Sequence, residues 1–262
     1  MPPAFRRAQI LDHIRREGGA SVAELARTYD VSPITVHRDL ERLTREGLVE
    51  RVHGGARALP GDGRRIETDW TKRLRQAWAA KEEIAERAVE WIEDGSIVFV
   101  DASTTCLALA RRLEQHPPKA LTLVTNSPAI ALELHAEAVH VIVTPGEVDQ
   151  NLRMIGGRWA VEFLSTLNFD TVFISAAGIT LEQCLTTTRR ALADTLNAAR
   201  TVSARTIGLI DSSKFGRSSL LSIMAAQDLD AVVVDDGLPD ETADRYARAG
   251  INIVSAAPAP TT

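Results

Sequence analysis

The chain has 262 residues, of which 45% are hydrophobic and 25% are charged, with no bias toward one residue type. This composition is typical of a globular protein, and the length suffices for a large sheet core or two domains. The formal net charge is −5, and no apolar run approaches a membrane span or a signal core. The sequence therefore excludes a membrane protein, and its overall charge does not by itself indicate a nucleic-acid partner.

The charges and cysteines are unevenly placed. Residues 1–57 hold ten Arg and eight Asp or Glu, whereas the remainder holds twenty Lys or Arg and twenty-seven Asp or Glu. Arg favours directional pairing over diffuse attraction. The two cysteines, Cys106 and Cys184, have no Cys or His nearby at metal-ligand spacing. We therefore expect a reduced, cytoplasmic protein with no metal and no cofactor.

The first 47 residues predict three helices. Apolar positions from Phe5 to Ile14 predict a helix over 4–18 that ends at Gly18-Gly19. Ser21 and Glu24 form a capping box at the start of a second, short helix. The run 30–33 breaks the chain, with Ser32 as an N-cap and Pro33 at the first position of a third helix.

The third helix has two distinct faces. Val36, Leu40 and Leu43 are spaced to be buried, and the other face carries Ile34, Thr35, His37, Arg38, Glu41, Arg42 and Arg45. Such a helix can enter a DNA major groove, where Arg can bind guanine O6 and N7. The alternative is an ordinary helical hairpin with a solvated basic face.

A hairpin follows this helix. Residues 48–52 predict a strand and 53–56 a turn, from which Arg57 leads out. Gly54 and Gly55 allow the backbone to approach a phosphate closely, and His53 and Arg57 supply hydrogen-bond donors. A hairpin behind a recognition helix is a wing.

The residues Val31-Ser32-Pro33-x-Thr35-Val36-x-Arg38-Asp39-Leu40 and His53-Gly54-Gly55-Ala56 resemble the winged helix-turn-helix of the DeoR family of bacterial transcription regulators. His37 stands where that family often has a second basic residue, usually Arg. The expected DNA-binding residues are Ser32, Pro33, Thr35, His37, Arg38, Arg42, His53, Gly54, Gly55 and Arg57.

The rest of the chain predicts a linker and an α/β domain. We expect a DNA-binding domain over 1–57, a linker over 58–76, a sensor domain over 77–255 and a disordered tail over 256–262. A helix is expected from about Thr71 to Glu93. Apolar runs predict a mostly parallel sheet of six or seven strands, at 97–100, 121–124, 139–143, 171–175, 206–210, 231–234 and 251–254. Helices between them are expected at 105–115, 128–137, 157–167, 188–200 and 240–249.

Polar residues follow four of these strands, at 101–105, 125–127, 145–147 and 211–216. Ligands of open α/β sheets bind beyond the carboxyl ends of the strands, and a helix N-terminus there suits a phosphate. Together the four segments predict a pocket for a small phosphorylated polyol. The alternative is that each is only a strand-to-helix turn rich in capping residues.

These segments are also similar to the sensor domain of the DeoR family, which is related in fold to ribose-5-phosphate isomerase and commonly binds sugar phosphates. The resemblance implies an effector site formed by Arg73, Lys81, Asp101, Ser103, Thr104, Thr105, Thr125, Asn126, Gly146, Glu147 and Lys214. Three positions depart from the family pattern. Pro145 replaces a usual Gly, and Leu192 and Leu196 replace a usual Glu and Lys. Because neither leucine can abstract a proton, the base that an isomerase needs is missing from this helix, which disfavours isomerase activity.

The sequence thus predicts a DNA-binding transcription regulator, most simply a repressor controlled by a phosphorylated metabolite. A dimer or tetramer is expected, because a monomer would contact too little DNA. Two alternatives remain at this point. One is a sugar-phosphate isomerase with an appended DNA-binding domain, and the other is an architectural DNA-binding module without a ligand.

Overall fold

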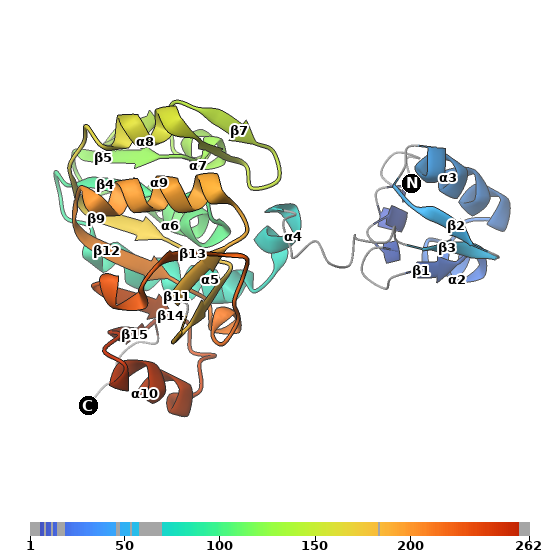
Figure 1. The fold of residues 1–262 in the computed structure, drawn as a ribbon. Coiled ribbons are helices and arrows are strands. Elements are labelled where there is room, and N and C mark those ends of the chain that lie inside the picture. Colours follow the sequence, from blue (N-terminus) through green and yellow to red (C-terminus); the bar gives the residue numbers. More distant parts are fainter. Residues whose placement is uncertain are drawn as a thin grey trace. The chain divides into compact units, whose positions relative to one another are not determined.

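The structure is a computed structural model that describes residues 6–7, 9–11, 13–14, 19–45, 48–52, 54–57, 70–182 and 184–256. The chain divides into two compact units, Met1–Thr68 and Asp69–Thr262 (Figure 1). No helix among the described residues is long and apolar enough to cross a membrane.

The first unit is a winged helix-turn-helix. Its described residues between 6 and 14 are helical and are followed by β1 (Gly19–Ser21), α2 (Val22–Thr28), α3 (Pro33–Arg45), β2 (Glu50–Val52) and β3 (Gly55–Arg57). The three strands form an antiparallel sheet in the order β1-β3-β2. The predicted motif is confirmed with two changes: the strand begins at Glu50, and Gly55 and Ala56 belong to β3 rather than to the turn.

One small core holds this unit together. Ile10, Ile14, Leu25, Val36 and Leu40 are fully buried in it. The predicted apolar stripe of α3 is therefore confirmed. A fully buried aliphatic side chain contributes about 1.5–3 kcal/mol to stability. This cluster therefore supplies the main stabilisation that holds the inner face of α3 against the rest of the unit.

The second unit is built on a parallel sheet of seven strands, as predicted. The order is β15-β14-β12-β9-β4-β5-β6, and every neighbouring pair is parallel. The strands in chain order are β4 (Ile97–Val100), β5 (Leu121–Thr125), β6 (Val139–Val143), β9 (Phe169–Ile174), β12 (Ser203–Leu209), β14 (Ala231–Val234) and β15 (Ile253–Ser255).

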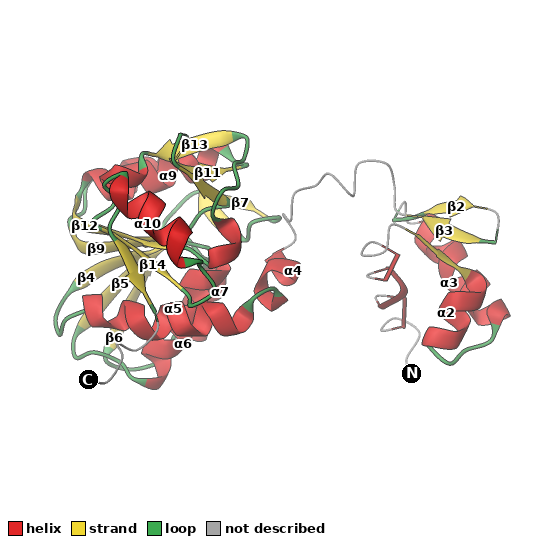
Figure 2. Ribbon diagram, turned by 90° about the horizontal axis from the view of Figure 1, so that it is seen from below, coloured by secondary structure: helices red, strands yellow, loops and turns green. Residues whose placement is uncertain are grey.

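Helices cover both faces of this sheet (Figures 1 and 2). Alternate strand residues point to opposite faces, so Val98 and Val100 join one core while Phe99 joins the other. The first core contains residues of α5 (Trp78–Ala88), α6 (Thr104–Gln115) and α7 (Pro128–Glu133). The second contains residues of α8 (Arg158–Leu164), α9 (Arg190–Thr201) and α10 (Asp240–Arg248).

The single helix expected from Thr71 to Glu93 is wrong. The chain forms α4 (Trp70–Arg75), a turn at Gln76-Ala77, α5 and a 3-10 turn, η1 (Val89–Trp91). Ala77 adopts a left-handed backbone with φ 49°, which ends the first helix. As a result α4 occupies part of the segment that was expected to be linker. Residues 58–69 lie outside the described residues.

Five short strands were not predicted. An antiparallel hairpin of β7 (Glu147–Asp149) and β8 (Met154–Gly156) follows β6. A second small sheet has the order β10 (Gly178–Thr180), β11 (Cys184–Thr187) and β13 (Leu221–Met224). Each has only three or four residues, too few for a sequence period to appear.

Ala256, the first residue of the predicted tail, is hydrogen-bonded to the sheet. The Ala256 N–H donates to Val234 O at 2.7 Å, so Ala256 extends the edge of the sheet. The remaining tail residues, 257–262, lie outside the described residues.

Candidate DNA-binding surface and effector pocket

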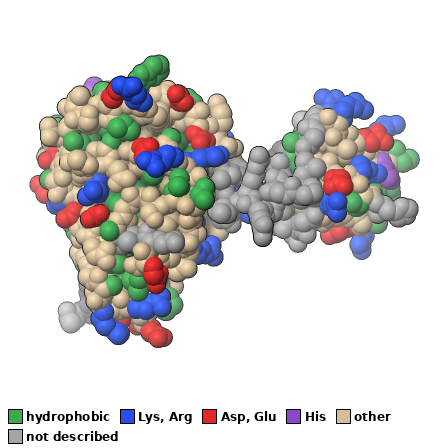
Figure 3. Space-filling model, viewed as in Figure 1, with side chains coloured by type: hydrophobic (Ala, Val, Ile, Leu, Met, Phe, Trp, Pro, Cys, Tyr) green, Lys and Arg blue, Asp and Glu red, His purple; other side chains and the backbone are tan. Residues whose placement is uncertain are grey.

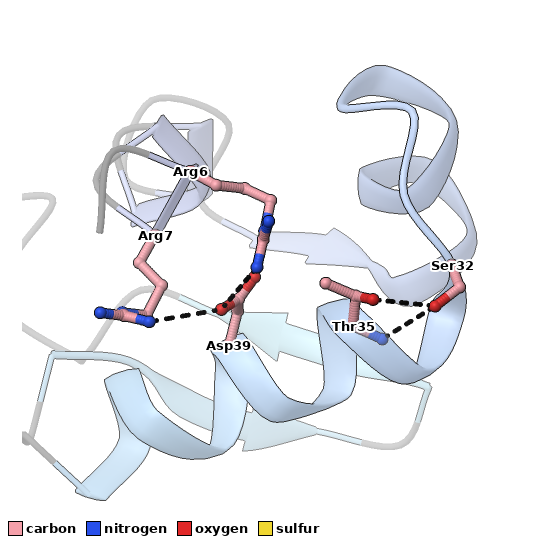
Figure 4. A network of polar contacts seen from close by, with 5 residues as sticks. All are labelled: Arg6, Arg7, Ser32, Thr35 and Asp39. Carbon is pink, nitrogen blue, oxygen red and sulfur yellow. Dashed lines mark hydrogen bonds and ion pairs between the residues drawn. The ribbon is translucent and has the colours of Figure 1, made fainter. Parts of the chain in front are cut away.

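The turn between α2 and α3 has the predicted caps. Ser21 Oγ accepts from Glu24 N at 3.1 Å while the Glu24 carboxylate accepts from Ser21 N, which completes the capping box. Ser32 Oγ accepts from Thr35 N at 3.2 Å and also hydrogen-bonds the Thr35 hydroxyl (Figure 4). The predicted site residues Ser32, Pro33 and Thr35 thus shape the N-terminus of α3.

A buried ion pair fixes α3 against the N-terminal helix. Asp39 is 4% exposed, and its Oδ2 lies 2.6 Å from Arg6 Nε, while its Oδ1 lies 3.7 Å from an Arg7 nitrogen (Figure 4). An intrahelical pair of Arg38 with Glu41 or with Asp39 is the alternative to base reading by Arg38. Asp39 pairs with the N-terminal helix instead, because consecutive residues on a helix do not face each other, and no ion pair joins Arg38 to Glu41, both of which the structure describes.

The outward face of α3 carries the remaining predicted residues. His37, Arg38 and Arg42 are exposed, together with Ile34. No hydrogen bond or ion pair joins Arg38 to another described residue. In the view of Figure 3, basic, hydrophobic and histidine side chains are exposed on one side of the smaller unit. This face therefore offers donors and an apolar group to a groove.

A polar side-chain contact joins the wing to α3. His37 Nδ1 lies 3.0 Å from the Arg51 guanidinium of β2. Arg57 instead makes two 3.0 Å hydrogen bonds to the Glu50 carboxylate, and both side chains are exposed. His53 lies outside the described residues. The wing thus presents two guanidinium groups, that of Arg51, which contacts His37 of the recognition helix, and that of Arg57, which is paired with Glu50.

The two wing glycines have different roles. Gly55 packs so closely on β1 that a Cβ would lie 2.2 Å from Ala20 O. Gly54 has φ +78° with open space around it. Gly55 therefore builds the wing sheet, and only Gly54 leaves its backbone accessible to a phosphate.

In the second unit, the sheet order reverses between β4 and β9. The chain proceeds from β4 to β5 and β6 on one side and from β9 to β12, β14 and β15 on the other. Such a reversal opens a crevice at the carboxyl ends of the strands, where ligands of α/β sheets bind. All four predicted polar segments follow strands of this sheet, so they share that edge.

Asp101 bridges the two strands at the reversal. Its Oδ2 accepts from Ser175 N at 2.7 Å, and its Oδ1 accepts from Ser103 N at 2.5 Å. Burial raises the pKa of the Asp101 carboxyl, and these backbone hydrogen bonds oppose that rise. Asp101 thus positions the loop that opens α6, a role the sequence did not reveal because Ser175 is 74 residues away.

The N-terminus of α6 lies beside α4. Ser103 Oγ caps α6 by accepting from Cys106 N at 3.0 Å, and Thr104 and Thr105 are buried in the first turn. The Thr104 hydroxyl donates to Arg73 O at 3.5 Å. Lys81, only 4% exposed, donates its ammonium group to Arg73 O at 2.9 Å and to Gln76 O. Lys81 and Thr104 therefore both bind the backbone carbonyl of Arg73.

Next to β4, the ends of β5 and β6 carry buried polar groups with unused hydrogen-bonding capacity. The Thr125 hydroxyl donates to Val100 O at 2.7 Å and accepts from Ser127 N. Asn126 is fully buried, yet its Oδ1 and Nδ2 have no partner among the described residues, and the same holds for Thr144 Oγ1. Thr144 N donates to Thr125 O, so these side chains belong to adjoining loops. Because unpaired buried amide atoms are costly, Asn126 is a candidate to hydrogen-bond a ligand in this region.

The β7–β8 hairpin packs over these loops. Ile155 N donates to Asn126 O at 2.7 Å, and Asp149 pairs with Arg189 at 3.2 Å. Gly146 has φ +145°, and a Cβ there would lie 2.3 Å from Gly156 O. Gly146 therefore shapes the hairpin rather than offering a side chain, whereas Glu147 is exposed.

Lys214 lies at the end of β12, next to β9. It belongs to a 3-10 turn, η2 (Ser212–Lys214), whose backbone folds back on Asp211. Asp211 accepts from the Ser213 hydroxyl, and no ion pair joins Asp211 to Lys214. The carboxylate of Asp211 therefore does not neutralise Lys214 in this structure.

Leu192 and Leu196 form apolar packing where charges were looked for. Leu196 is fully buried, and Leu192 packs against a small cluster of Ala102, Leu152 and Met154. This cluster makes an apolar wall beside the Asp101 loop. Ser175, Thr144, Asp149 and Arg153 were not predicted from the sequence as site residues. A polar residue at the end of a predicted strand or directly after it, as in Ser175 and Thr144, is the signal that could have found two of them.

Comparisons with known proteins agree with this architecture. A family model for the DeoR-like helix-turn-helix domain matches residues 6–60, and one for the DeoR C terminal sensor domain matches residues 76–236. The HTH-type transcriptional regulator GlpR of Haloferax volcanii is 32% identical over 97% of this chain and 98% of its own. The glycerol-3-phosphate regulon repressor of Escherichia coli K12 is 32% identical over 90% of this chain and 92% of its own.

A solved structure of ribose 5 phosphate isomerase A from Neisseria gonorrhoeae is 15% identical, with a TM-score of 0.40, over 53% of this chain and 54% of that chain. The fold class is defined here by the sheet itself. No group of three or more His, Cys, Asp or Glu side chains among the described residues could hold a metal ion. The relatives are named as regulators, so the enzyme alternative is not favoured. The chain belongs to the DeoR family and is a DNA-binding transcriptional regulator.

Proposed function

We propose that this regulator is a repressor whose operator affinity is lowered by a small phosphorylated sugar or polyol. The observation that carries the proposal is the polar edge at the reversal of the sheet, with the unpartnered amide of Asn126 inside it. A sugar hydroxyl both donates and accepts, so it can satisfy both amide atoms at once. One relative is named for glycerol 3-phosphate, which is of this chemical class.

The groups around the pocket divide between two parts of such a ligand. Lys214 and the N–H groups at the start of α6 favour the phosphate, because a cation and a helix N-terminus both stabilise an anion. Asn126 and Thr144 favour hydroxyl groups. The Ala102, Leu152, Met154 and Leu192 wall has no charge and limits the ligand to a small, neutral remainder.

Repression also requires an assembly. We infer a homodimer or a tetramer, because two helix-turn-helix units bind two half-sites about one helical turn apart. The effector then acts by binding one arrangement of the sensor units better than the other, which is a coupling free energy of typically 1–3 kcal/mol. Since the chain acts on DNA, we place it in the cytoplasm.

The test compares wild type with Lys214→Ala. Thermal shift is measured with glycerol 3-phosphate, ribose 5-phosphate and fructose 6-phosphate, each against its unphosphorylated parent and against inorganic phosphate. We expect one phosphate ester to raise the wild-type melting temperature and to release a DNA site selected from a random pool. Lys214→Ala should fold and bind that DNA normally but should no longer release it when the ester is added. The substitution removes only the ammonium group that pairs with the ligand's phosphate.

The control variant is Lys119→Ala, an exposed Lys that lies before the amino end of β5, whereas the predicted site lies beyond the carboxyl ends of the strands. It should keep both the thermal shift and the release. A Lys214→Ala protein that melts earlier yet still releases DNA with the ester would contradict this pocket.

A further inference from the structure

We propose that Ile34 reads the 5-methyl group of a thymine in the operator and so determines part of the DNA specificity. Ile34 is 66% exposed in the first turn of α3 and takes no part in the core of its unit. The other large aliphatic residues of α3, Val36, Leu40 and Leu43, are at most 3% exposed. Packing therefore does not explain an isoleucine at this position.

The neighbours of Ile34 are those of a groove-reading residue. It precedes His37 by three positions and Arg38 by four, so all three share one face of the helix. Arg42 and Arg45 continue the basic character along α3. A cationic surface with one apolar group matches the DNA major groove, where thymine alone presents a methyl group among acceptors and donors.

His37 is already occupied within the protein. Its Nδ1 contacts the Arg51 guanidinium at 3.0 Å, which holds the imidazole toward the wing. Ile34 and Arg38 are thus two exposed side chains in the first two turns that make no side-chain hydrogen bond or ion pair with another described residue. Arg38 provides the hydrogen-bonding half of the readout, and Ile34 provides the apolar half.

The spacing makes the inference specific. Side chains four residues apart on a helix have Cβ atoms about 5–6 Å apart. Since base pairs are stacked about 3.4 Å apart, this distance spans about two base pairs. The thymine read by Ile34 should therefore lie within about two base pairs of the guanine read by Arg38, in each half-site.

The experiment removes the methyl group from the DNA and the side chain from the protein separately. A duplex is first selected from a randomised pool with the wild-type, full-length chain. Each thymine is then replaced singly by deoxyuridine, and binding is measured by fluorescence anisotropy at fixed salt. We expect one position per half-site to weaken wild-type binding about fourfold, equivalent to about 0.8 kcal/mol for one methyl-sized group.

Ile34→Ala should bind the thymine duplex more weakly than wild type and show no further loss at that deoxyuridine position. Its affinity for random DNA should be unchanged, and its melting temperature should not fall, because the side chain is exposed and Ala favours a helix. Val52→Ala is the matched control, since Val52 is the other large hydrophobic residue exposed in the described part of this unit, at 39%. It should keep the full penalty.

Two results would overturn the inference. One is a wild-type chain that binds every deoxyuridine duplex as tightly as the parent, and this needs no variant. The other is an Ile34→Ala protein that retains the wild-type penalty at the same position. Both results are compared with binding to the selected thymine duplex. If Ile34 does not read a thymine, that duplex is still bound, so the failure of this inference can be told apart from a failure to bind DNA.

Discussion

Arg38 is exposed on the recognition helix, and its carboxylate neighbour Asp39 is committed to Arg6 and Arg7. We predict that Arg38→Ala lowers affinity for the selected operator by about 1–3 kcal/mol, as expected for loss of a bidentate contact to guanine. Folding should be unaffected, because no described residue pairs with this guanidinium. The measurement is an anisotropy titration at fixed salt, paired with thermal unfolding.

The control for Arg38 is Arg45→Ala at the far end of the same helix, which is also exposed. It removes the same charge without removing the proposed base contact, so it should weaken operator and random DNA to a similar, small extent. Equal discrimination between operator and random DNA in the two variants would show that Arg38 does not read a base.

Single residues were predictable from sequence where the rule is local. The caps at Ser21 and Ser32 involve partners three residues away, and the structure has both. Long-range partners were not predictable. Asp39 meets Arg6 across 33 positions and Asp101 meets Ser175 across 74, and nothing in the spacing along the chain reports such contacts.

At the scale of elements, the wing has an internal competition. Two of the five N–H donors of the Arg57 guanidinium are bound to the Glu50 carboxylate, which also neutralises its charge, so Glu50 competes with a phosphate for Arg57. We predict that Arg57→Ala weakens specific and random DNA alike and reduces the salt slope by about 0.9, the value for one phosphate contact. Glu50→Gln should do the reverse and strengthen binding to both, because it frees the guanidinium.

These two variants should be equally stable, since an exposed ion pair contributes only about 0–1 kcal/mol. Affinity for operator and for random duplex is measured from about 50 to about 200 mM salt, and the slope of log affinity against log salt concentration is compared between the variants. A loss in Arg57→Ala that is confined to the operator would show instead that the wing reads bases.

The long strands were predictable because a strand buried on both faces is a continuous apolar run, as in Ala231–Val234. The break between α4 and α5 was not. Ala favours a helix, yet Ala77 is left-handed. That backbone is supported by Lys81, whose ammonium group binds the Arg73 and Gln76 carbonyls at the end of α4. These contacts override the helical preference of Ala77. The helical spacing of apolar residues continues across Gln76-Ala77, so the sequence shows no sign of the break.

At the scale of the whole molecule, control by an effector requires a physical route from the pocket toward the DNA-binding unit. The first described element after residues 58–69 is α4, and three groups from the pocket region contact it. Thr104 and Lys81 both donate to Arg73 O, at 3.5 and 2.9 Å. The Arg153 guanidinium, at the tip of the β7–β8 hairpin, lies 4.5 Å from the centre of the Trp70 ring.

Because these contacts join α4 to the predicted site, we infer that α4 is the element whose position the proposed effector changes. A ligand that engages Thr104 or Lys81 competes for the groups that hold the Arg73 carbonyl, and a ligand on Asn126 acts on the hairpin through Ile155. Trp70 is only 8% exposed, and the Arg153 guanidinium is one of the groups that cover its ring. The hairpin and the α6 loop therefore hold the two ends of α4 independently.

We predict that Arg153→Ala separates effector binding from DNA release. Removing the cation weakens the hairpin contact to Trp70 but leaves Lys214, Asn126 and the recognition helix untouched. The variant should bind the selected operator and the phosphate ester as wild type does, while the ratio of effector affinities with and without operator falls toward one. Arg158→Ala, which removes an exposed guanidinium paired only with Glu162 among the described residues, is the matched control and should keep the wild-type ratio.

The measurement is effector titration with and without saturating operator, and operator titration with and without effector. Linkage requires both ratios to be equal, so the two experiments check each other. Wild type and Arg158→Ala should show the same coupling, and Arg153→Ala should show less. If Arg153→Ala keeps the full ratio, the signal reaches α4 through Thr104 and Lys81 alone, and the hairpin serves only to close the pocket.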